Sequence, residues 1–290
     1  MKIGLQINRF TWKGQPDTIR DTLEKIARTA DDAGFYSIWV MDHFFQIGHI
    51  GDPEEPMLEA YTTLGFLAGI TKKAKLGTMV TGVIYRNPAL LAKIITTLDV
   101  LSKGRAYLGI GAAWNEEESK ALGFEFPPLK ERFEQLEEAL QIIQQMWKGD
   151  EKPYNGKHYH LGRPLNSPQV LTKPHPPILI GGGGEKKTLR LVAQYADACN
   201  LFIRLGDEEN KRKLDILRQH CIDVGRNYDD IEKTALYQIG ETMNPDEVIT
   251  DMKNARELGF THIILGIRNV EEITPLKTFA EKILPEVSKL

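Results

Sequence analysis

The sequence predicts an α/β fold, a (β/α)8 TIM barrel with insertions, and three observations lead to this prediction. Short runs of β-branched residues alternate with amphipathic helical stretches, and eight strand–helix units can be counted along the chain. The length of 290 residues suits one such barrel. No G-x-G-x-x-G turn follows the first strand, which disfavours an open, doubly wound sheet, the alternative arrangement for parallel strands covered by helices. We therefore expect a single barrel domain over residues 1–290.

The expected strands are enriched in β-branched and other apolar residues: Lys2–Ile7, Ser37–Met41, Lys75–Val80, Arg105–Ile110, Ile178–Ile180, Ala198–Phe202, Ile231–Tyr237 and His262–Leu265. The expected helices carry apolar residues three and four positions apart: Asp17–Ala33, Glu59–Ile70, Asn87–Leu101, Lys130–Trp147, Glu185–Tyr195, Asp207–Val224, Pro245–Leu258 and Ile273–Leu284. Gly34 marks the end of the first helix, and Pro88 stands in a first helical turn, where proline is tolerated.

Two stretches interrupt this alternation. Phe44–Leu58 follows the second strand and is rich in glycine, proline and acidic residues, so we expect it at the catalytic face, where long strand-to-helix loops of barrel enzymes lie. Gly149–Pro177 lies between a helix and the following strand and therefore starts at the opposite rim. It would have to fold back along the barrel to reach an active site.

Composition excludes several classes of partner. Hydrophobic residues make up 41% and charged residues 27% of the chain, and the net charge is -3, so neither nucleic acid nor an anionic membrane is expected as a partner. The N-terminal residues read directly into a strand, no apolar run is long enough to span a membrane, and Cys199 and Cys221 lack C-x-x-C spacing. We expect a cytoplasmic protein without disulfides.

Asp42 and His43 come directly after the second strand, at the rim where barrel enzymes carry out their chemistry. A titratable pair at this position is suited to proton transfer or to holding a polar ring. The alternative is an aspartate at a helix entry beside a histidine that bonds only to backbone.

Gly181–Gly184 joins the fifth strand to its helix. Consecutive glycines expose backbone N–H groups at a helix N-terminus with no side chain in the way, which favours phosphate binding over a plain tight turn. Lys186, Lys187 and Arg190 add positive charge nearby, and Glu185 is expected to face away from an anion.

The third and fourth strands also end in residues suited to a ligand. Thr78–Gly82 offers hydroxyls and a permissive glycine, and Gly109–Asn115 offers small residues that allow a flat ring to approach the backbone, with an amide at its end. Glu116–Glu118 is expected to be a solvated helix start, because no histidine is spaced to complete a metal site. His158, His160 and His175 also lack metal-ligand spacing, so no metal is expected.

With these motifs in place, the chain resembles the bacterial luciferase-like superfamily, in particular its deazaflavin (coenzyme F420)-dependent oxidoreductases. The resemblance covers nearly the whole chain and rests on four segments in order: MDHFFQ (41–46), TMVTGVIYRNPALLAKIITTLDVLSKGRAYLGIGAAWNEEE (78–118), FPPLKERFEQLEEALQIIQQMW (126–147) and KPHPPILIGGGGEKKTLRLVAQYAD (173–197).

The resemblance implies roles for individual residues. Asp42 and His43 would lie beside the redox ring, with His43 as the catalytic residue and Phe44 in the substrate pocket. A strained bulge, often with a non-prolyl cis peptide, is expected at the end of the third strand. The implied cofactor-binding residues are Asp42, Thr78, Met79, Val80, Thr81, Ala112, Ala113, Asn115 and, at the phosphate, Gly182, Gly183 and Gly184.

One position departs from the sugar-phosphate dehydrogenases of this group. They carry a catalytic glutamate where this chain has Trp114, so an acid–base role at that position is lost and Trp114 is expected to line a more apolar, planar substrate pocket. The resemblance implies coenzyme F420 and hydride transfer to or from a small organic substrate, in a homodimer. Relatives that use FMN share the fold and the histidine, so an FMN-dependent monooxygenase is the alternative, and a binding protein that merely sequesters a flavin is a third.

Overall fold

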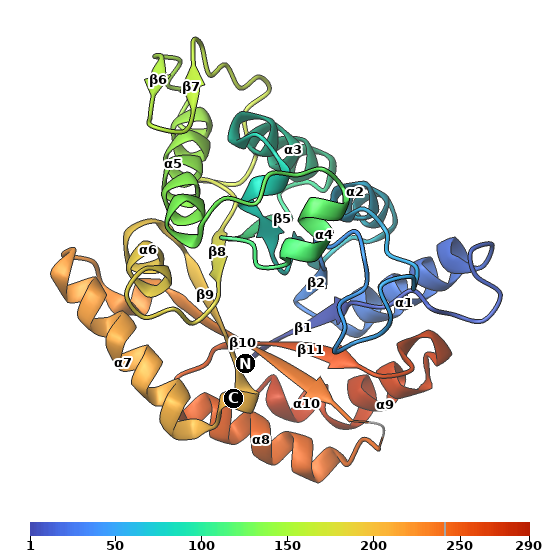
Figure 1. Cartoon of the computed structure of the whole chain (residues 1–290). Coiled ribbons are helices and arrows are strands. Elements are labelled where there is room, and N and C mark those ends of the chain that lie inside the picture. The colour runs from blue at the N-terminus through green and yellow to red at the C-terminus, as the bar shows by residue number, and fades with distance from the viewer. Residues whose placement is uncertain (241) are drawn as a thin grey trace.

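The structure is a computed structural model and describes residues 1–240 and 242–290. Eight parallel strands pair side by side in the order β1 (Lys2–Ile7), β2 (Ser37–Val40), β3 (Lys75–Thr78), β5 (Ala106–Gly111), β8 (Ile178–Gly181), β9 (Ala198–Phe202), β10 (Glu232–Ile239) and β11 (His262–Ile267). Pairing of β11 with β1 and of β3 with β5 closes the ring (Figure 1). The predicted (β/α)8 barrel is thereby confirmed.

Helices surround the barrel in the predicted order (Figure 1). They are α1 (Ile19–Ala33), α2 (Ala60–Ile70), α3 (Pro88–Leu101), α5 (Leu129–Trp147), α6 (Thr188–Tyr195), α7 (Asp207–Asp223), α8 (Pro245–Glu257), α9 (Thr274–Lys282) and α10 (Leu284–Val287), with the short α4 (Glu116–Ala121) after β5. Short 3-10 turns lie at Val83–Tyr85 (η1), Ile203–Leu205 (η2), Tyr228–Asp230 (η3) and Val270–Glu272 (η4). No helix of the described residues is long and apolar enough to cross a bilayer.

Three predicted boundaries are wrong. β3 ends at Thr78 instead of Val80, because the cis peptide Met79–Val80 interrupts the strand before β4 (Thr81–Gly82) resumes pairing with β5. This cis bond lies where the bulge was expected. α6 begins at Thr188, since the residues after the glycines form turns, not helix. The expected helix Ile273–Leu284 is two helices, because Pro285 has no N–H to continue a helical ladder.

The strands are buried on both faces, as a barrel covered by helices requires. One apolar cluster comprises Trp39, Met79, Tyr107, Leu179, Ala198 and Ile264, which fill the barrel interior. A larger cluster joins the outward faces of the strands, among them Leu5, Ile38 and Leu76, to the helices. Small residues make the interior fit: a Cβ on Gly77 would lie 2.7 Å from the Trp39 ring.

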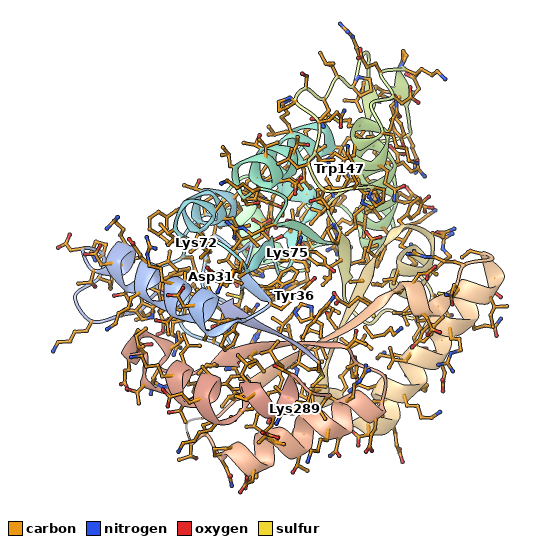
Figure 2. All side chains as sticks on the ribbon, turned by 180° about the vertical axis from the view of Figure 1, so that it is seen from behind. Asp31, Tyr36, Lys72, Lys75, Trp147 and Lys289 are labelled. Atoms are coloured by element: carbon orange, nitrogen blue, oxygen red, sulfur yellow. The ribbon has the colours of Figure 1, made fainter. Side chains whose placement is uncertain are left out.

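Buried side chains fasten the loops at the amino ends of the strands. Asp31, at the end of α1, accepts hydrogen bonds from the backbone N–H groups of Lys72, Lys73 and Ala74, and Figure 2 shows it beside Lys72. Burial alone would raise the pKa of Asp31, but these N–H groups outweigh it and lower the pKa. The Arg105 guanidinium donates to the carbonyls that precede β3, including that of Ala74.

The insertion Gly149–Pro177 does not fold back to the carboxyl ends of the strands. Its hairpin, β6 (Tyr154–Asn155) and β7 (His160–Leu161), lies beside α5, beyond one end of that helix in Figure 1. Glu138 of α5 accepts the backbone N–H groups of Lys157, His158 and Tyr159, so it holds the turn of the hairpin.

A polar network closes the barrel interior at the amino end of the strands. Ser37 lies 2.9 Å from His262 Nε2, and the Nδ1 of His262 lies 3.3 Å from Glu232. Glu232 also accepts from Lys2 and Tyr107, at 2.7 and 3.1 Å. The order Ser–His–Glu resembles a hydrolytic triad, but Ser37 and His262 have no solvent exposure, so no substrate can reach them.

Replacing Glu232 tests this network. Burial alone would raise its pKa, but hydrogen bonds and charge from His262 and Lys2 outweigh burial and lower the pKa to about 2. The carboxylate therefore stabilises the fold above its unfolded pKa of about 4.5, and this contribution is lost as the pH falls toward 2. We expect Glu232→Gln to lower the free energy of unfolding by about 2–3 kcal/mol at neutral pH.

The measurement is urea unfolding at about pH 7 and about pH 3.5, where the difference between wild type and Glu232→Gln should narrow. Glu257→Gln, on the exposed face of α8, is the control and should change little at either pH. A difference that stays constant between the two pH values would contradict an ionised Glu232 in the network.

Candidate active site

A cavity of about 930 Å³ opens at the carboxyl ends of the strands, the face on which barrel enzymes place their chemistry. Its wall combines residues from strand ends and following loops, among them Gln6, His43, Met79, Trp114, Phe202 and Gln238. The loop after β2 contributes Ile47, His49, Ile50 and Glu55, as expected for the Phe44–Leu58 insertion. No residue of Gly149–Pro177 lines this cavity.

His43 lies on the cavity wall, and its ring is fixed from behind by Glu118 of α4. The His43 Nδ1 lies 2.9 Å from Glu118 Oε2, and the two side chains are 13% and 0% exposed. Trp114 packs edge-on against the His43 ring, with centroids 5.3 Å apart. The imidazole is thus held between a buried carboxylate and an indole.

The Glu118 carboxylate collects four hydrogen bonds. Oε1 accepts the backbone N–H groups of Phe44 and Phe45, and Oε2 accepts from His43 and from the Tyr85 hydroxyl, 2.9 Å away. Burial alone would raise the pKa of Glu118, but the bonds from His43, Phe45 and Phe44 outweigh it and lower the pKa. Glu118 is therefore an anion at neutral pH, and the expectation of a solvated glutamate run is wrong at this position.

An ionised carboxylate can only accept hydrogen bonds, so the proton between Glu118 and His43 belongs to His43 Nδ1. The neutral imidazole then carries its lone pair on Nε2. This nitrogen, free of Glu118, is the one available to a molecule in the cavity.

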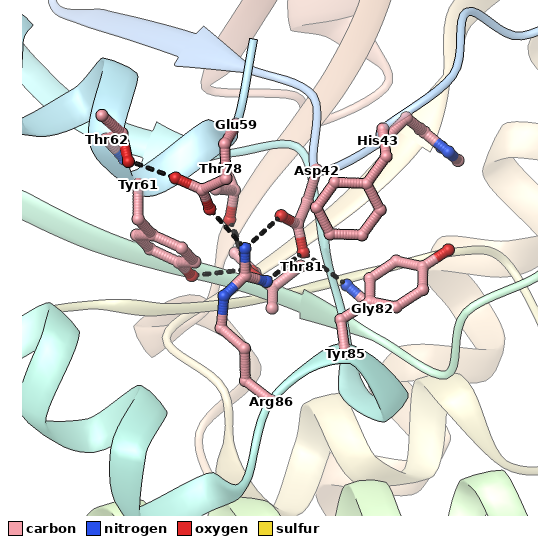
Figure 3. Close-up of polar contacts among 12 residues, drawn as sticks. Asp42, His43, Glu59, Tyr61, Thr62, Thr78, Thr81, Gly82, Tyr85 and Arg86 are labelled. Carbon is pink, nitrogen blue, oxygen red and sulfur yellow. Dashed lines mark hydrogen bonds and ion pairs between the residues drawn. The ribbon is translucent and has the colours of Figure 1, made fainter. Parts of the chain in front are cut away.

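Asp42 lies on the other side of the strand end and takes part in a second buried network (Figure 3). Both of its oxygens accept from Arg86, at 2.7 and 2.9 Å, and Arg86 also donates to Glu59 at 2.6 Å. Although burial alone would lower the pKa of Arg86, the Asp42 carboxylate raises it, so the guanidinium stays charged. Asp42 is 2% exposed and does not line the cavity.

The residues at the end of β3 also fall into two groups, one that lines the cavity and one that is buried in a hydrogen-bonded network. Met79 lines the cavity, whereas Thr78 and Thr81 are buried and hydrogen-bonded to each other at 2.7 Å. Thr81 also bonds Tyr61, which lies under Arg86 (Figure 3). Val80 packs against the glycines of the neighbouring strands: a Cβ on Gly181 would lie 2.9 Å from it.

After β5, Trp114 reaches the cavity but its neighbours do not line it. Ala113 adopts a left-handed conformation (φ 59°), and the carbonyls of Ala112 and Ala113 accept from Arg132. The Asn115 side chain caps α4 by accepting the Glu118 N–H. Phe44, expected in the substrate pocket, instead packs against Tyr85 and Phe124.

The glycine turn follows β8, at the same carboxyl end of the barrel as the cavity, and none of its glycines lines that cavity. The carbonyl of Gly183 accepts from Lys213 Nζ, while no acceptor within the described chain meets the N–H groups of Gly183 or Gly184. A Cβ on Gly184 would lie 2.8 Å from Thr188 Oγ1. Glu185 forms an ion pair with Arg212 at 2.6 Å. This agrees with the expectation that its side chain faces away from a bound phosphate.

Sequence reasoning identified His43 and Trp114 but missed Glu118 and Arg86. A signal for Glu118 existed: it is the third acidic residue in the first turn of a helix that starts at the strand end, so the helical turn carries it inward. Arg86 follows η1, 44 residues from Asp42, and no local pattern marks that pairing.

Comparison with known proteins adds family information. The family described as luciferase-like monooxygenases matches residues 1–265. An F420-dependent glucose-6-phosphate dehydrogenase of Kineococcus radiotolerans is 35% identical over 243 residues, which cover 82% of this chain and 69% of that protein. Its counterpart in Amycolatopsis mediterranei is 33% identical over 180 residues, or 61% of this chain and half of that protein's length.

Solved structures share the fold. The F420-dependent tetrahydromethanopterin reductase of Methanopyrus kandleri has a TM-score of 0.80 at 16% identity and covers 99% of both chains. A monooxygenase of Streptomyces bottropensis has the same TM-score at 18% identity, covering 98% of this chain and 99% of its own.

The Glu118–His43 contact predicts the outcome of Glu118→Gln. The two backbone N–H groups at Oε1 require an oxygen, so the new amide must turn its NH2 toward His43 and donate to Nδ1. We expect the His43 ring to change from the Nδ1–H to the Nε2–H form, as visible in two-bond ¹⁵N–¹H NMR spectra of the ring. Tyr85→Phe, which removes one bond to Glu118 but no charge, is the control and should leave the Nδ1–H form. An unchanged tautomer in Glu118→Gln would refute the assignment.

Proposed function

Because the chain belongs to the luciferase-like monooxygenase family, we propose that it is a coenzyme F420-dependent oxidoreductase that transfers hydride between the deazaflavin and a small organic substrate. The observation that carries this proposal is the His43 ring, which the buried Glu118 holds on the wall of a 930 Å³ cavity with Nε2 left for a ligand. The curated relatives named for F420-dependent dehydrogenation, 33–35% identical, support the choice of cofactor.

The residues present fit a phosphate-bearing ring cofactor. The N–H groups of Gly183 and Gly184 lack acceptors in the described chain, and a side chain at Gly184 would fill the space beside Thr188. We assign the phosphate to Gly182–Gly184 and the ring to the cavity rim at Met79 and Trp114, next to Val80, Ala112, Ala113 and Asn115, which do not themselves line the cavity. Asp42, Thr78 and Thr81 support this rim from behind through Arg86 and Tyr61.

The bound deazaflavin would accept or supply the hydride, and the chain's own residues handle the proton. Neutral His43, with Nδ1–H bonded to Glu118, can take a proton from a substrate hydroxyl or amine at Nε2 as the substrate is oxidised. The Glu118 anion stabilises the imidazolium that results. In the reverse direction the imidazolium returns this proton to the substrate.

Trp114 separates this site from a sugar-phosphate site. The resemblance implies that Trp114 stands where the sugar-phosphate dehydrogenases of the group carry a catalytic glutamate, and its ring lies edge-on to His43. The carboxylate beside the histidine here, Glu118, has no solvent exposure and cannot touch a substrate. We therefore propose that His43 is the single proton-transfer residue. We also propose that the substrate is not glucose 6-phosphate, the compound for which the relatives are named.

The second candidate is an FMN-dependent monooxygenase. It is favoured by the family description and by the fold of an EDTA monooxygenase from Chelativorans, whose TM-score of 0.84 at 14% identity covers all of this chain. The homodimer implied by the resemblance is also a proposal. Its support is the exposure of Leu90 and Leu101 on α3, 54% and 66%.

Cofactor titration separates the two candidates. We expect F420 to bind at micromolar or tighter dissociation constants and FMN to bind at least tenfold more weakly, with absorbance change as the measurement. Tight FMN binding together with flavin-driven substrate oxidation, and no affinity for F420, would overturn the proposal.

A variant of the glycine turn tests the phosphate assignment in the same titration. Gly184→Val should weaken F420 binding about tenfold or more, because its side chain would occupy the proposed phosphate position. The phosphate-free 8-hydroxy-5-deazariboflavin should bind both proteins equally. Gly162→Val, where a Cβ meets nothing within 4 Å, is the matched control. Equal losses for both deazaflavins would point to a distorted fold and against a phosphate cradle.

His43→Ala tests catalysis against mere binding. We expect turnover to fall by 10²–10⁴, the usual size of a general acid–base contribution, while the dissociation constant of the cofactor changes less than about threefold. Full turnover in His43→Ala would show that His43 is not the proton-transfer residue, and absence of turnover in both proteins would favour the sequestering protein. The readout is F420 absorbance during turnover, set beside the titration of the same variant.

A further inference from the structure

Gln6 is a buried amide on the cavity wall that has no partner within the described chain. It lies on β1, is 8% exposed and lines the cavity. Every other inward position of β1 is accounted for: Gly4 leaves room for the hydrogen-bonded Ser37 and His262. Because the Gln6 amide reaches the cavity and has no partner in the described chain, it is available to a polar group of a ligand there.

A second amide lies two strands away. Gln6 pairs in register with Gly266 of β11, and Gly266 pairs with Gln238 of β10, so all three positions face the same side. A Cβ on Gly266 would collide with the amide of Gln238, so glycine is required for that side chain to lie across β11. Gln238 lines the cavity as well, and its amide likewise has no hydrogen-bond partner in the described chain. The Gln238 amide therefore lies over Gly266, beside the register position of Gln6, and we call this place on the cavity wall the notch.

The cavity wall around this notch is mixed, because Arg204, Arg268 and Glu271 line it beside apolar side chains. Met41, Met79, Leu236 and Ile267 line the same cavity. The Arg9 guanidinium is engaged by Glu55 at 3.4 Å and by the carbonyl of Ile50. A primary amide offers a hydrogen-bond donor and a hydrogen-bond acceptor and carries no charge. It therefore suits an uncharged ligand group that also has one donor and one acceptor.

The notch lies across the barrel from the proposed cofactor residues. Those residues follow β3, β5 and β8, whereas the amides belong to β10 and β1, on the two sides of β11 in the ring of strands. The substrate side of the cavity is therefore the side that carries Gln6 and Gln238.

We propose that Gln6 and Gln238 form a substrate subsite for an uncharged, planar molecule with an N–H next to a C=O, such as a lactam or ring amide. This assignment to the substrate rests on the proposed function, since the redox ring itself has an edge of the same chemistry. The amides hold the polar edge, and the apolar side chains of Met41, Leu236 and Ile267 receive the ring.

Paired probes test the subsite without any turnover. We compare 2-quinolone with N-methyl-2-quinolone, which lacks the N–H, by calorimetry on the full chain, alone and loaded with F420. Wild type should bind 2-quinolone about tenfold more tightly, because the methyl compound leaves an amide acceptor unpaired. Gln6→Leu should reduce the ratio to about one. Gln219→Leu, on the exposed face of α7, should keep it.

Equal or absent binding of the two quinolones to wild type overturns the proposal, as does an unchanged ratio in Gln6→Leu. A tenfold loss of F420 affinity in Gln6→Leu, with the quinolone ratio kept, assigns the notch to the cofactor and also overturns it. If Gln6→Leu does not fold, the same ratio of quinolone affinities is measured in Gln238→Leu, which changes an exposed position. A ratio unchanged from wild type in that variant overturns the proposal. Failure of the F420 titration alone leaves the quinolone ratio measurable, so the two proposals fail separately.

Discussion

The active-site side of the barrel depends on one buried anion. Glu118 has no solvent exposure, and a carboxylate in that position is tolerable only when its oxygens are fully bonded. Its four donors come from the segment after β2 and from Tyr85 after β4, so one side chain on α4 joins three pieces of chain. The position of His43 is a consequence of this constraint, because its ring is one of the required donors.

The same principle operates twice more. Arg86 needs the Asp42 carboxylate as much as Asp42 needs Arg86, and the pair fixes the end of β2 relative to η1. At the opposite end of the barrel, Glu232 gathers Lys2, Tyr107 and His262. Each network links strands or loops far apart in sequence. Charge burial thus sets the geometry of both ends, while apolar packing fills the interior between them.

The fold could be predicted because each strand–helix unit is encoded locally, by apolar spacing and by turn residues such as Gly34. The position of His43 followed from the same logic, since a residue after a barrel strand must lie at the rim. The partners could not be predicted, because Glu118 lies 75 residues from His43 and its burial depends on the packing of α4. For the same reason Asp42, adjacent in sequence, was grouped with His43 although the two side chains enter different networks.

These separate networks hold the carboxylates of Asp42 and Glu118 away from the cavity lining. Asp42 and Glu118 are consumed by Arg86 and by backbone N–H groups, and neither touches the cavity directly. The proposed proton transfer would then use the one nitrogen of His43 that Glu118 does not hold. The proposed subsite would rest recognition on the uncharged amides of Gln6 and Gln238. On these proposals the site separates two tasks: the buried charges fix the His43 ring, and neutral amides select the molecule that it acts on.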